Sequence, residues 1–256
     1  MQSPQQFLTV SSLRPSNGRT VGGAEFARVN PEQLLGLPRH PIGASLSRFA
    51  IREQAMIHLI ENHLEPGNRP LLESMFADRK LQFVDFFGWD VPVVDGRFEI
   101  DQFDGPRAVY IIAADDEGRH EASMRMLPTV LPHLLDTLFP HLCFRGVPTG
   151  PTTWESTRLC LPQRHGATRR LVLRDRLISA MVDFALARGI DRITGVIPDG
   201  FRKLVLAMGW KAQPLGPAVR IRGGMIGAFA IDIDRDTPDR LGWTGVYRPA
   251  EERIAA

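Results

Sequence analysis

From about residue 54 onward, the hydrophobic positions of this chain follow two kinds of pattern. Apolar residues that recur every three to four positions predict helices, and short apolar runs between turn residues predict strands. These patterns predict helices over residues 70–87, 131–142, 168–188 and 200–207, and strands over residues 54–60, 107–114, 120–126, 153–161, 190–197 and 219–233, the last with a break at Gly223 and Gly224. Because strands and helices are mixed around a hairpin signal at residues 115–119, we predict an α/β (α+β) fold with three layers, α-β-α, around a central mixed sheet.

Residues 168–188 have the clearest helical pattern. We expect Thr168 to cap the first turn and Gly189 to end the helix in a left-handed conformation. The predicted buried stripe consists of Leu171, Val172, Ile178, Met181, Val182 and Ala185.

The first 50 residues differ from the rest of the chain. They are rich in Ser, Pro, Gly, Asn and Gln, show no sustained period, and hold five arginines against two acids. We therefore predict a flexible N-terminal extension over residues 1–50. Residues 51–256 are expected to form a single domain.

Composition excludes several classes of protein. The 256 residues are 43% hydrophobic and 23% charged, and the net charge of +2 is too small to predict a nucleic-acid-binding surface. Two cysteines, Cys143 and Cys160, form no disulfide framework and no metal-binding spacing. No apolar run approaches the ~18 residues of a membrane span. We expect a soluble cytoplasmic protein without a metal site, either a monomer or a weak homo-oligomer.

The segment Glu99 to Pro106 concentrates candidate chemistry. Asp101 and Asp104 lie three residues apart with Phe103 between them, and Arg79, Phe83 and Trp89 precede them. Carboxylates, a guanidinium and large rings together suit a ligand that is cationic, amino-bearing and partly flat. The alternative is a solvated acidic turn, which is the usual role of acids beside Gly-Pro.

Further residues extend this set in a recognisable order. Arg125 precedes the sequence Leu127-Pro128-Thr129, Phe139 follows fourteen residues later, and Glu155 and Arg158 are spaced Glu-x-x-Arg on a predicted strand. With Arg79, Phe83, Trp89 and the Glu99 to Pro106 segment, this pattern resembles the acyl-homoserine lactone synthases, the LuxI-type autoinducer synthases. The resemblance runs from about residue 55 to about residue 235.

The resemblance implies a GNAT-like acyltransferase fold with a splayed central sheet. It also implies two substrates, S-adenosyl-methionine and an acyl thioester carried by acyl carrier protein or coenzyme A, and no cofactor. The amine of S-adenosyl-methionine attacks the thioester, and its carboxylate then closes a lactone and expels methylthioadenosine. The product would be a quorum-sensing signal.

By this resemblance, the catalytic residues are Glu155, Arg158 and Arg125, with Glu155 as the candidate base. The S-adenosyl-methionine site would contain Arg79, Phe83, Trp89, Asp101, Phe103, Asp104 and Phe139. Two alternatives stay open: the arginines form a structural ion-pair network with the acids, or Glu155 only pairs with Arg158. Residues three apart on a regular strand point to opposite faces, so Glu155 and Arg158 share a site only if a β-bulge separates them.

The thioester side involves two further groups. Met126, Leu142, Met181, Phe184 and Gly195 are candidates for an acyl pocket. Gly195 stands where many 3-oxo-acyl producers have Thr, which favours an unsubstituted or 3-hydroxy chain. Arg164, Arg169, Arg170 and Arg174 surround the start of the 168–188 helix, where they could dock acidic acyl carrier protein; the alternative is a solvated helix face.

Two other functions compete with the synthase interpretation. One is a GNAT-fold acyltransferase that acts on a different amine, and the other is an inactive synthase-like binding protein. The Asp101–Asp104 segment with Trp89 disfavours the first, and the complete set of polar site residues disfavours the second.

Overall fold

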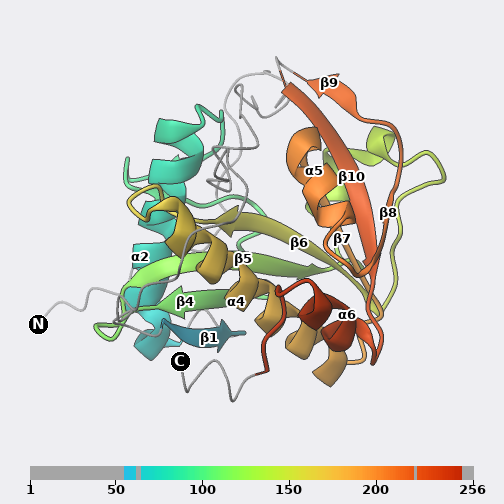
Figure 1. The fold of residues 1–256 in the computed structure, drawn as a ribbon. Helices are drawn as coiled ribbons and strands as arrows, with labels where there is room; N and C mark the ends of the chain where they lie inside the picture. Colours follow the sequence, from blue (N-terminus) through green and yellow to red (C-terminus); the bar gives the residue numbers. More distant parts are fainter. Residues whose placement is uncertain (1–54, 62–64, 222–223, 250–256) are drawn as a thin grey trace, which may run out of the picture.

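The computed structural model describes residues 55–61, 65–221 and 224–249, so the extension predicted over residues 1–50 lies outside the described part. Within it, one sheet runs in the order β1 (Met56–Ile60), β4 (Val109–Ala114), β5 (His120–Pro128), β6 (Thr153–Cys160), β7 (Arg192–Pro198), β10 (Gly224–Asp232) and β8 (Lys211–Pro214), with β9 (Val219–Ile221) paired to β10 (Figure 1). The β6–β7 pair is parallel and the other pairs are antiparallel.

The helical segments cover both faces of this sheet. They are η2 (Pro66–Asn68), α2 (Arg69–Arg79), the π-helix η3 (Lys80–Phe86), α3 (Leu134–Thr137), η4 (Pro140–Leu142), α4 (Ala167–Ala187), α5 (Asp199–Leu206) and α6 (Thr237–Trp243). A small second sheet pairs β2 (Val93–Val94) with β3 (Phe98–Glu99).

The position of strand β4 in the sheet explains why its sequence is almost continuously apolar. Val109 and Ile111 belong to the hydrophobic cluster that contains the α4 side chains, whereas Tyr110 and Ile112 belong to the cluster on the α2 side. A strand that is covered on both faces has no solvent-facing set of positions, so it does not alternate. The three-layer α-β-α arrangement predicted from sequence is therefore confirmed.

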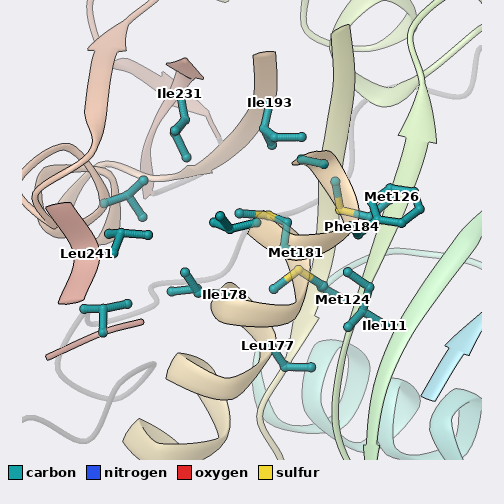
Figure 2. Packing of buried hydrophobic residues seen from close by; sticks show 14 of the residues in the cluster. Ile111, Met124, Met126, Leu177, Ile178, Met181, Phe184, Ile193, Ile231 and Leu241 are labelled. Atoms are coloured by element: carbon teal, nitrogen blue, oxygen red, sulfur yellow. The ribbon is translucent and has the colours of Figure 1, made fainter. Parts of the chain in front are cut away.

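Helix α4 packs its apolar stripe against the sheet (Figure 2). Ile178 and Met181 belong to the same hydrophobic cluster as Met124, Ile193 and Ile231, which come from three strands. Gly189 has a φ of 64°, so the predicted left-handed helix end is confirmed.

Two details of the α4 prediction are wrong. The N-cap residue is Gly166 and not Thr168, so the helix begins at Ala167, and Thr168 lies within its first turn. Val172 is 36% exposed, and Leu173 and Leu177 occupy the buried stripe in its place.

The central sheet opens between β6 and β7. The two strands pair only over residues 153–155 and 192–194, and Figure 1 shows β10 steeply inclined to β4 and β5. On its other side, β6 pairs with β5 through a register shift between Ser123 and Arg125, and Arg158 has a φ of 53°. A β-bulge therefore separates Glu155 from Arg158, which meets the condition under which the two side chains can share a site.

Other boundaries differ from the sequence prediction. The helix expected over residues 70–87 changes from α to π geometry at Lys80, and the helix expected over residues 131–142 is reduced to α3 and η4. Strands β2, β3 and β8 and helix α6 had no predicted counterpart. These elements are short, and their periods are too brief to recognise in sequence.

Candidate active site

Asp104 lies at the centre of a buried set of charges. Its carboxylate accepts bonds from Arg79 Nη1 at 2.8 Å and Nη2 at 2.9 Å, and Arg125 Nη1 lies 2.7 Å away. The Tyr110 hydroxyl donates to it at 2.9 Å, and the Asp101 backbone N–H donates at 2.8 Å. Both oxygens of Asp104 therefore have several donors within the protein.

Arg158 joins the same set from the bulge of β6. It donates to Glu99 at 2.8 Å and to Asp101 at 2.6 Å. Its guanidinium lies 5.6 Å from the ring centre of Phe83 and 6.0 Å from that of Trp89. These two rings stack on each other at 4.7 Å, so Arg158 contacts both the acids and the aromatic pair.

Four parts of the chain contribute to what we call the charge network: Arg79, Arg125, Arg158, Glu99, Asp101 and Asp104. Arg79 ends α2, Arg125 lies on β5, and the acids come from β3 and the turn after it. Asp101 Oδ1 accepts the Phe103 backbone N–H at 2.8 Å, which holds this turn in one shape. The side chains of Arg79, Arg125 and Asp104 are at most 1% exposed, which supports the ion-pair-network alternative for them.

Opposite charges keep the carboxylates of Asp104 and Asp101 ionised. Burial by itself would raise the pKa of Asp104, but Arg125 and Arg79 hold that pKa well below its usual value. The pKa of Asp101 is also lowered, because Arg158 and Arg125 outweigh its burial. A buried charge of this kind is tolerated only when its partners are in place.

Glu155 has a different environment. Its oxygens accept the backbone N–H groups of Leu134 and Leu135, each at 2.8 Å, and its side chain is fully buried. Burial raises the pKa of Glu155 to about 7, against the opposing effects of these N–H groups and of Arg125. Glu155 and Arg158 have different partners, so the alternative in which Glu155 only pairs with Arg158 is wrong.

An apolar cavity of about 110 Å³ lies beside the network. The cavity is bordered on the network side by Phe83, Trp89 and Arg158. It is also lined by Leu134, whose N–H bonds Glu155, and by Ser156, the next residue in the sequence after Glu155. Its other walls come from α4, β7, α5 and β10, through residues that include Ile178, Met181, Ile193, Val196, Phe201, Phe229 and Ile231. The opening between β6 and β7 thus leads from charged side chains into a hydrophobic chamber.

Of the predicted acyl-pocket residues, Met181 lines this cavity. Met126 and Phe184 are buried in the surrounding hydrophobic cluster, and Leu142 is buried on the opposite face of the sheet, so none of these three forms a wall of the cavity. The Cα of Gly195 lies opposite Phe229, whose ring occupies the space where a side chain at position 195 would be.

The predicted S-adenosyl-methionine residues divide between two places. Phe83 and Trp89 border the cavity, whereas Phe103 and Phe139 are buried in the cluster on the α2 face. The ring of Phe103 lies 5.8 Å from Arg125, which connects it to the charge network. The roles predicted for these residues remain predictions.

The four predicted docking arginines surround the start of α4, and each has a partner within the chain. Arg164 pairs with Asp78 at 2.6 Å, and Arg174 pairs with Asp175. Arg169 pairs with Glu121, and Arg170 donates to Gln163. Arg164 is 47% exposed, so part of this charge stays open to solvent.

Gln82 has a structural role that the sequence did not indicate. Its side chain is 2% exposed, donates to the Leu159 carbonyl at 3.3 Å and accepts the Leu161 backbone N–H at 2.9 Å. These two backbone groups lie one and three residues after Arg158, next to the place where the β5–β6 ladder is disturbed. Gln82 thus supplies the hydrogen bonds that a neighbouring strand would otherwise make.

Tyr110 and Thr157 also escaped the sequence analysis. The Tyr110 hydroxyl bonds Asp104, and the Thr157 hydroxyl accepts from Arg125 Nε at 3.0 Å. A tyrosine in an otherwise aliphatic strand was the one available signal, because a buried hydroxyl needs a partner.

Known proteins are similar to this chain in sequence and in fold. The family model described as autoinducer synthase matches residues 64–241. An acyl-homoserine-lactone synthase of Ralstonia nicotianae is 37% identical over 170 residues, which are 64% of this chain and 82% of the relative. This chain belongs to the autoinducer synthase family.

Further relatives agree with this assignment. An isovaleryl-homoserine lactone synthase of Bradyrhizobium diazoefficiens is 30% identical to this chain over 210 residues, which are 78% of this chain and 92% of the relative. The solved structure of BjaI, a CoA-dependent acyl-homoserine lactone synthase with SAM and isopentyl-CoA, matches with a TM-score of 0.66 at 27% identity, over 78% of this chain and 97% of that one. The predicted family, the GNAT-like fold and the acyltransferase class are confirmed.

Two negative findings concern only the described ranges. No helix within the described ranges is both long enough and apolar enough to cross a membrane. Those ranges also contain no group of three or more His, Cys, Asp or Glu side chains placed to hold a metal ion.

Replacing Asp104 tests the charge network of the synthase. We expect Asp104→Asn to lower the free energy of unfolding by about 3–5 kcal/mol, because Arg79 and Arg125 would stay buried without this counter-charge. Denaturant unfolding measures the loss. As a control, Glu73→Gln removes the exposed Arg69–Glu73 pair and should cost less than ~1 kcal/mol. Equal unfolding midpoints for Asp104→Asn and the unchanged protein would contradict the role assigned to this network.

Replacing Gln82 tests the support of the β6 bulge. Gln82→Met keeps the size of the side chain but leaves the Leu159 carbonyl and the Leu161 N–H unsatisfied, so we expect a loss of about 1–3 kcal/mol. Gln213→Met, at an exposed position of β8, is the matched control. If both variants show the same thermal unfolding temperature, the hydrogen bonds of Gln82 are not needed to hold the bulge.

Proposed function

We propose that this protein transfers an acyl group from an acyl thioester to the amine of S-adenosyl-methionine and then closes the lactone with release of methylthioadenosine. The observation that carries this proposal is the juxtaposition of an apolar cavity with Arg158, Phe83 and Trp89 at its border. An acyl chain needs an apolar chamber, and S-adenosyl-methionine needs aromatic faces and charged groups beside it.

In this proposal, S-adenosyl-methionine binds where the network meets the cavity. Phe83 and Trp89 offer rings to the sulfonium or the adenine, and Asp101 and Arg158 face its charged groups. Phe103 and Phe139 complete the aromatic surroundings. Arg79, Arg125 and Asp104 act by holding the Glu99–Pro106 segment in place, since their own groups are engaged with one another.

The proton of the attacking amine goes to Glu155. A base is most effective when its pKa lies near the working pH, and the pKa of about 7 at Glu155 meets this condition. Its carboxylate accepts the Leu134 N–H and does not itself line the cavity, whereas Leu134 and the adjacent Ser156 do, so we propose that one water molecule connects it to the amine. The amine nitrogen then bonds to the thioester carbon, and the thiolate leaves.

The second step uses only groups of the substrate. A carboxylate oxygen of the acylated intermediate attacks its γ-carbon, and the bond from that carbon to the sulfonium sulfur breaks. The electron pair of this bond neutralises the sulfonium as methylthioadenosine leaves. The protein needs to bring the carboxylate and the γ-carbon into line, which is a positioning task.

The acyl chain occupies the cavity, whose walls consist mostly of apolar side chains. For the donor we propose coenzyme A or acyl carrier protein. The N-terminus of α4 has no side-chain cap, and Arg164, Arg169, Arg170 and Arg174 lie around it, which suits the phosphate groups of either carrier.

The reaction itself is the first test. Incubating the protein with S-adenosyl-methionine and C4 to C12 acyl thioesters, each as acyl-CoA and as acyl carrier protein, should yield lactone and methylthioadenosine in equal amounts by mass spectrometry. Acylated product without methylthioadenosine would indicate an acyltransferase that does not form lactones. No product from any donor would contradict the proposed function.

The pH dependence of turnover tests Glu155. The base must be deprotonated, so kcat should fall as the pH decreases through about 7. Glu155→Gln should lower kcat about 10²–10⁴-fold and remove this acidic limb from the residual activity.

Asp136→Asn is the matched control for Glu155→Gln. It removes a nearby negative charge that raises the pKa of Glu155, so it should keep activity and move the acidic limb to lower pH. An acidic limb that persists unchanged in Glu155→Gln would exclude Glu155 as the base.

A further inference from the structure

Gly195 and Phe229 face each other directly across β7 and β10. A Cβ atom on Gly195 would lie 2.7 Å from Cζ and 2.8 Å from Cε1 of the Phe229 ring, and 3.0 Å from the Ser156 carbonyl oxygen. The two distances to the ring are shorter than the contacts that real Cβ atoms make. The ring of Phe229 therefore rests on the bare backbone of Gly195.

This contact forms part of the wall of the apolar cavity. Ile193 and Ile197 line the cavity from β7, and Gly195 lies between them on the same face of the strand. A side chain at position 195 would consequently point toward the cavity. The Phe229 ring, which is 5% exposed and lines the cavity, occupies that position from the neighbouring strand.

The chemistry of this wall is uniform. Ile193, Ile231 and Met181 surround Phe229 with apolar atoms. An oxygen on an acyl chain at this depth would lose its hydrogen bonds to water without a replacement, which disfavours binding of a substituted chain. The wall formed by Phe229 thus restricts both the length of a chain and its substituents.

We propose that Phe229, seated in the space left by Gly195, is the residue that selects the acyl chain. This inference rests on the proposed function. It treats Gly195 and Phe229 together, because the Phe229 ring fits only while position 195 has no side chain. A smaller residue at position 229 extends the chamber. A larger residue at position 195 displaces the ring into the chamber and shortens it.

Rates with a series of acyl thioesters test the proposal. Phe229→Val should move the optimum of kcat/KM to chains at least two carbons longer, with about a tenfold or larger gain for these chains relative to the original optimum. Gly195→Ala should shift the preference to shorter chains by a similar factor, because the ring must move. In the double variant the Cβ no longer meets a ring, so the effects of the two changes should not add.

Controls separate selection from loss of stability. Leu177→Ala opens space in the same hydrophobic cluster on α4 but away from the cavity wall, and it should leave the order of preferred chains unchanged. Phe229→Leu, a smaller change in volume, serves if Phe229→Val does not fold. A folded Phe229 variant with an unchanged chain profile would overturn the proposal, as would an equal shift in Leu177→Ala.

Binding distinguishes failure of this inference from failure of the proposed function. Calorimetric titration of the unchanged protein and of Phe229→Val with acyl-CoA of C4 to C12, without S-adenosyl-methionine, reports the chamber independently of turnover. A shift toward longer chains in binding supports the selector role even if no lactone forms. Identical chain-length dependence in the two proteins overturns it even if the unchanged protein is fully active.

Discussion

The pairing of Asp104 with Arg79 and Arg125 is the interaction on which the rest of the site depends. These side chains are almost completely removed from water, and each charge is acceptable there only because an opposite charge touches it. Their backbones come from the end of α2, from β5 and from the turn after β3. Buried ion pairs therefore connect the turn to both the helix and the sheet.

The second constraint is the opening of the sheet after Glu155. Parallel pairing of β6 with β7 ends there, and the bulge at Arg158 disturbs the pairing with β5. Backbone groups released in this way must find other partners, which Gln82 provides at Leu159 and Leu161. The cavity lies on the other side of β6, beyond the point where its pairing with β7 ends, so the bulge and the chamber flank the same segment of this strand.

Sequence predicted the parts of this fold whose signal is local. Strand β4 and helix α4 were placed closely because an apolar run between turn residues and a long amphipathic period each favour one type of element. The charged residues that were grouped from the sequence do lie together in the structure, but their partners were not predicted, since spacing along the chain does not show which arginine reaches which acid. The contacts of Gln82 and the Gly195–Phe229 pair join distant segments, and no short pattern reports them.

Arg158 illustrates how two demands can meet in one residue. Its positive φ of 53° favours glycine, and any other residue at this position, arginine included, carries a conformational cost of about 1–3 kcal/mol. Glycine would remove that cost, but it would also remove the hydrogen bonds to Glu99 and Asp101. Lysine would keep a positive charge, but its single ammonium group cannot replace the planar guanidinium that bridges the two acids and lies near the rings of Phe83 and Trp89. Neither the residue that suits the backbone nor the one that preserves the charge can replace it, so mutational tolerance at this position is restricted from both directions.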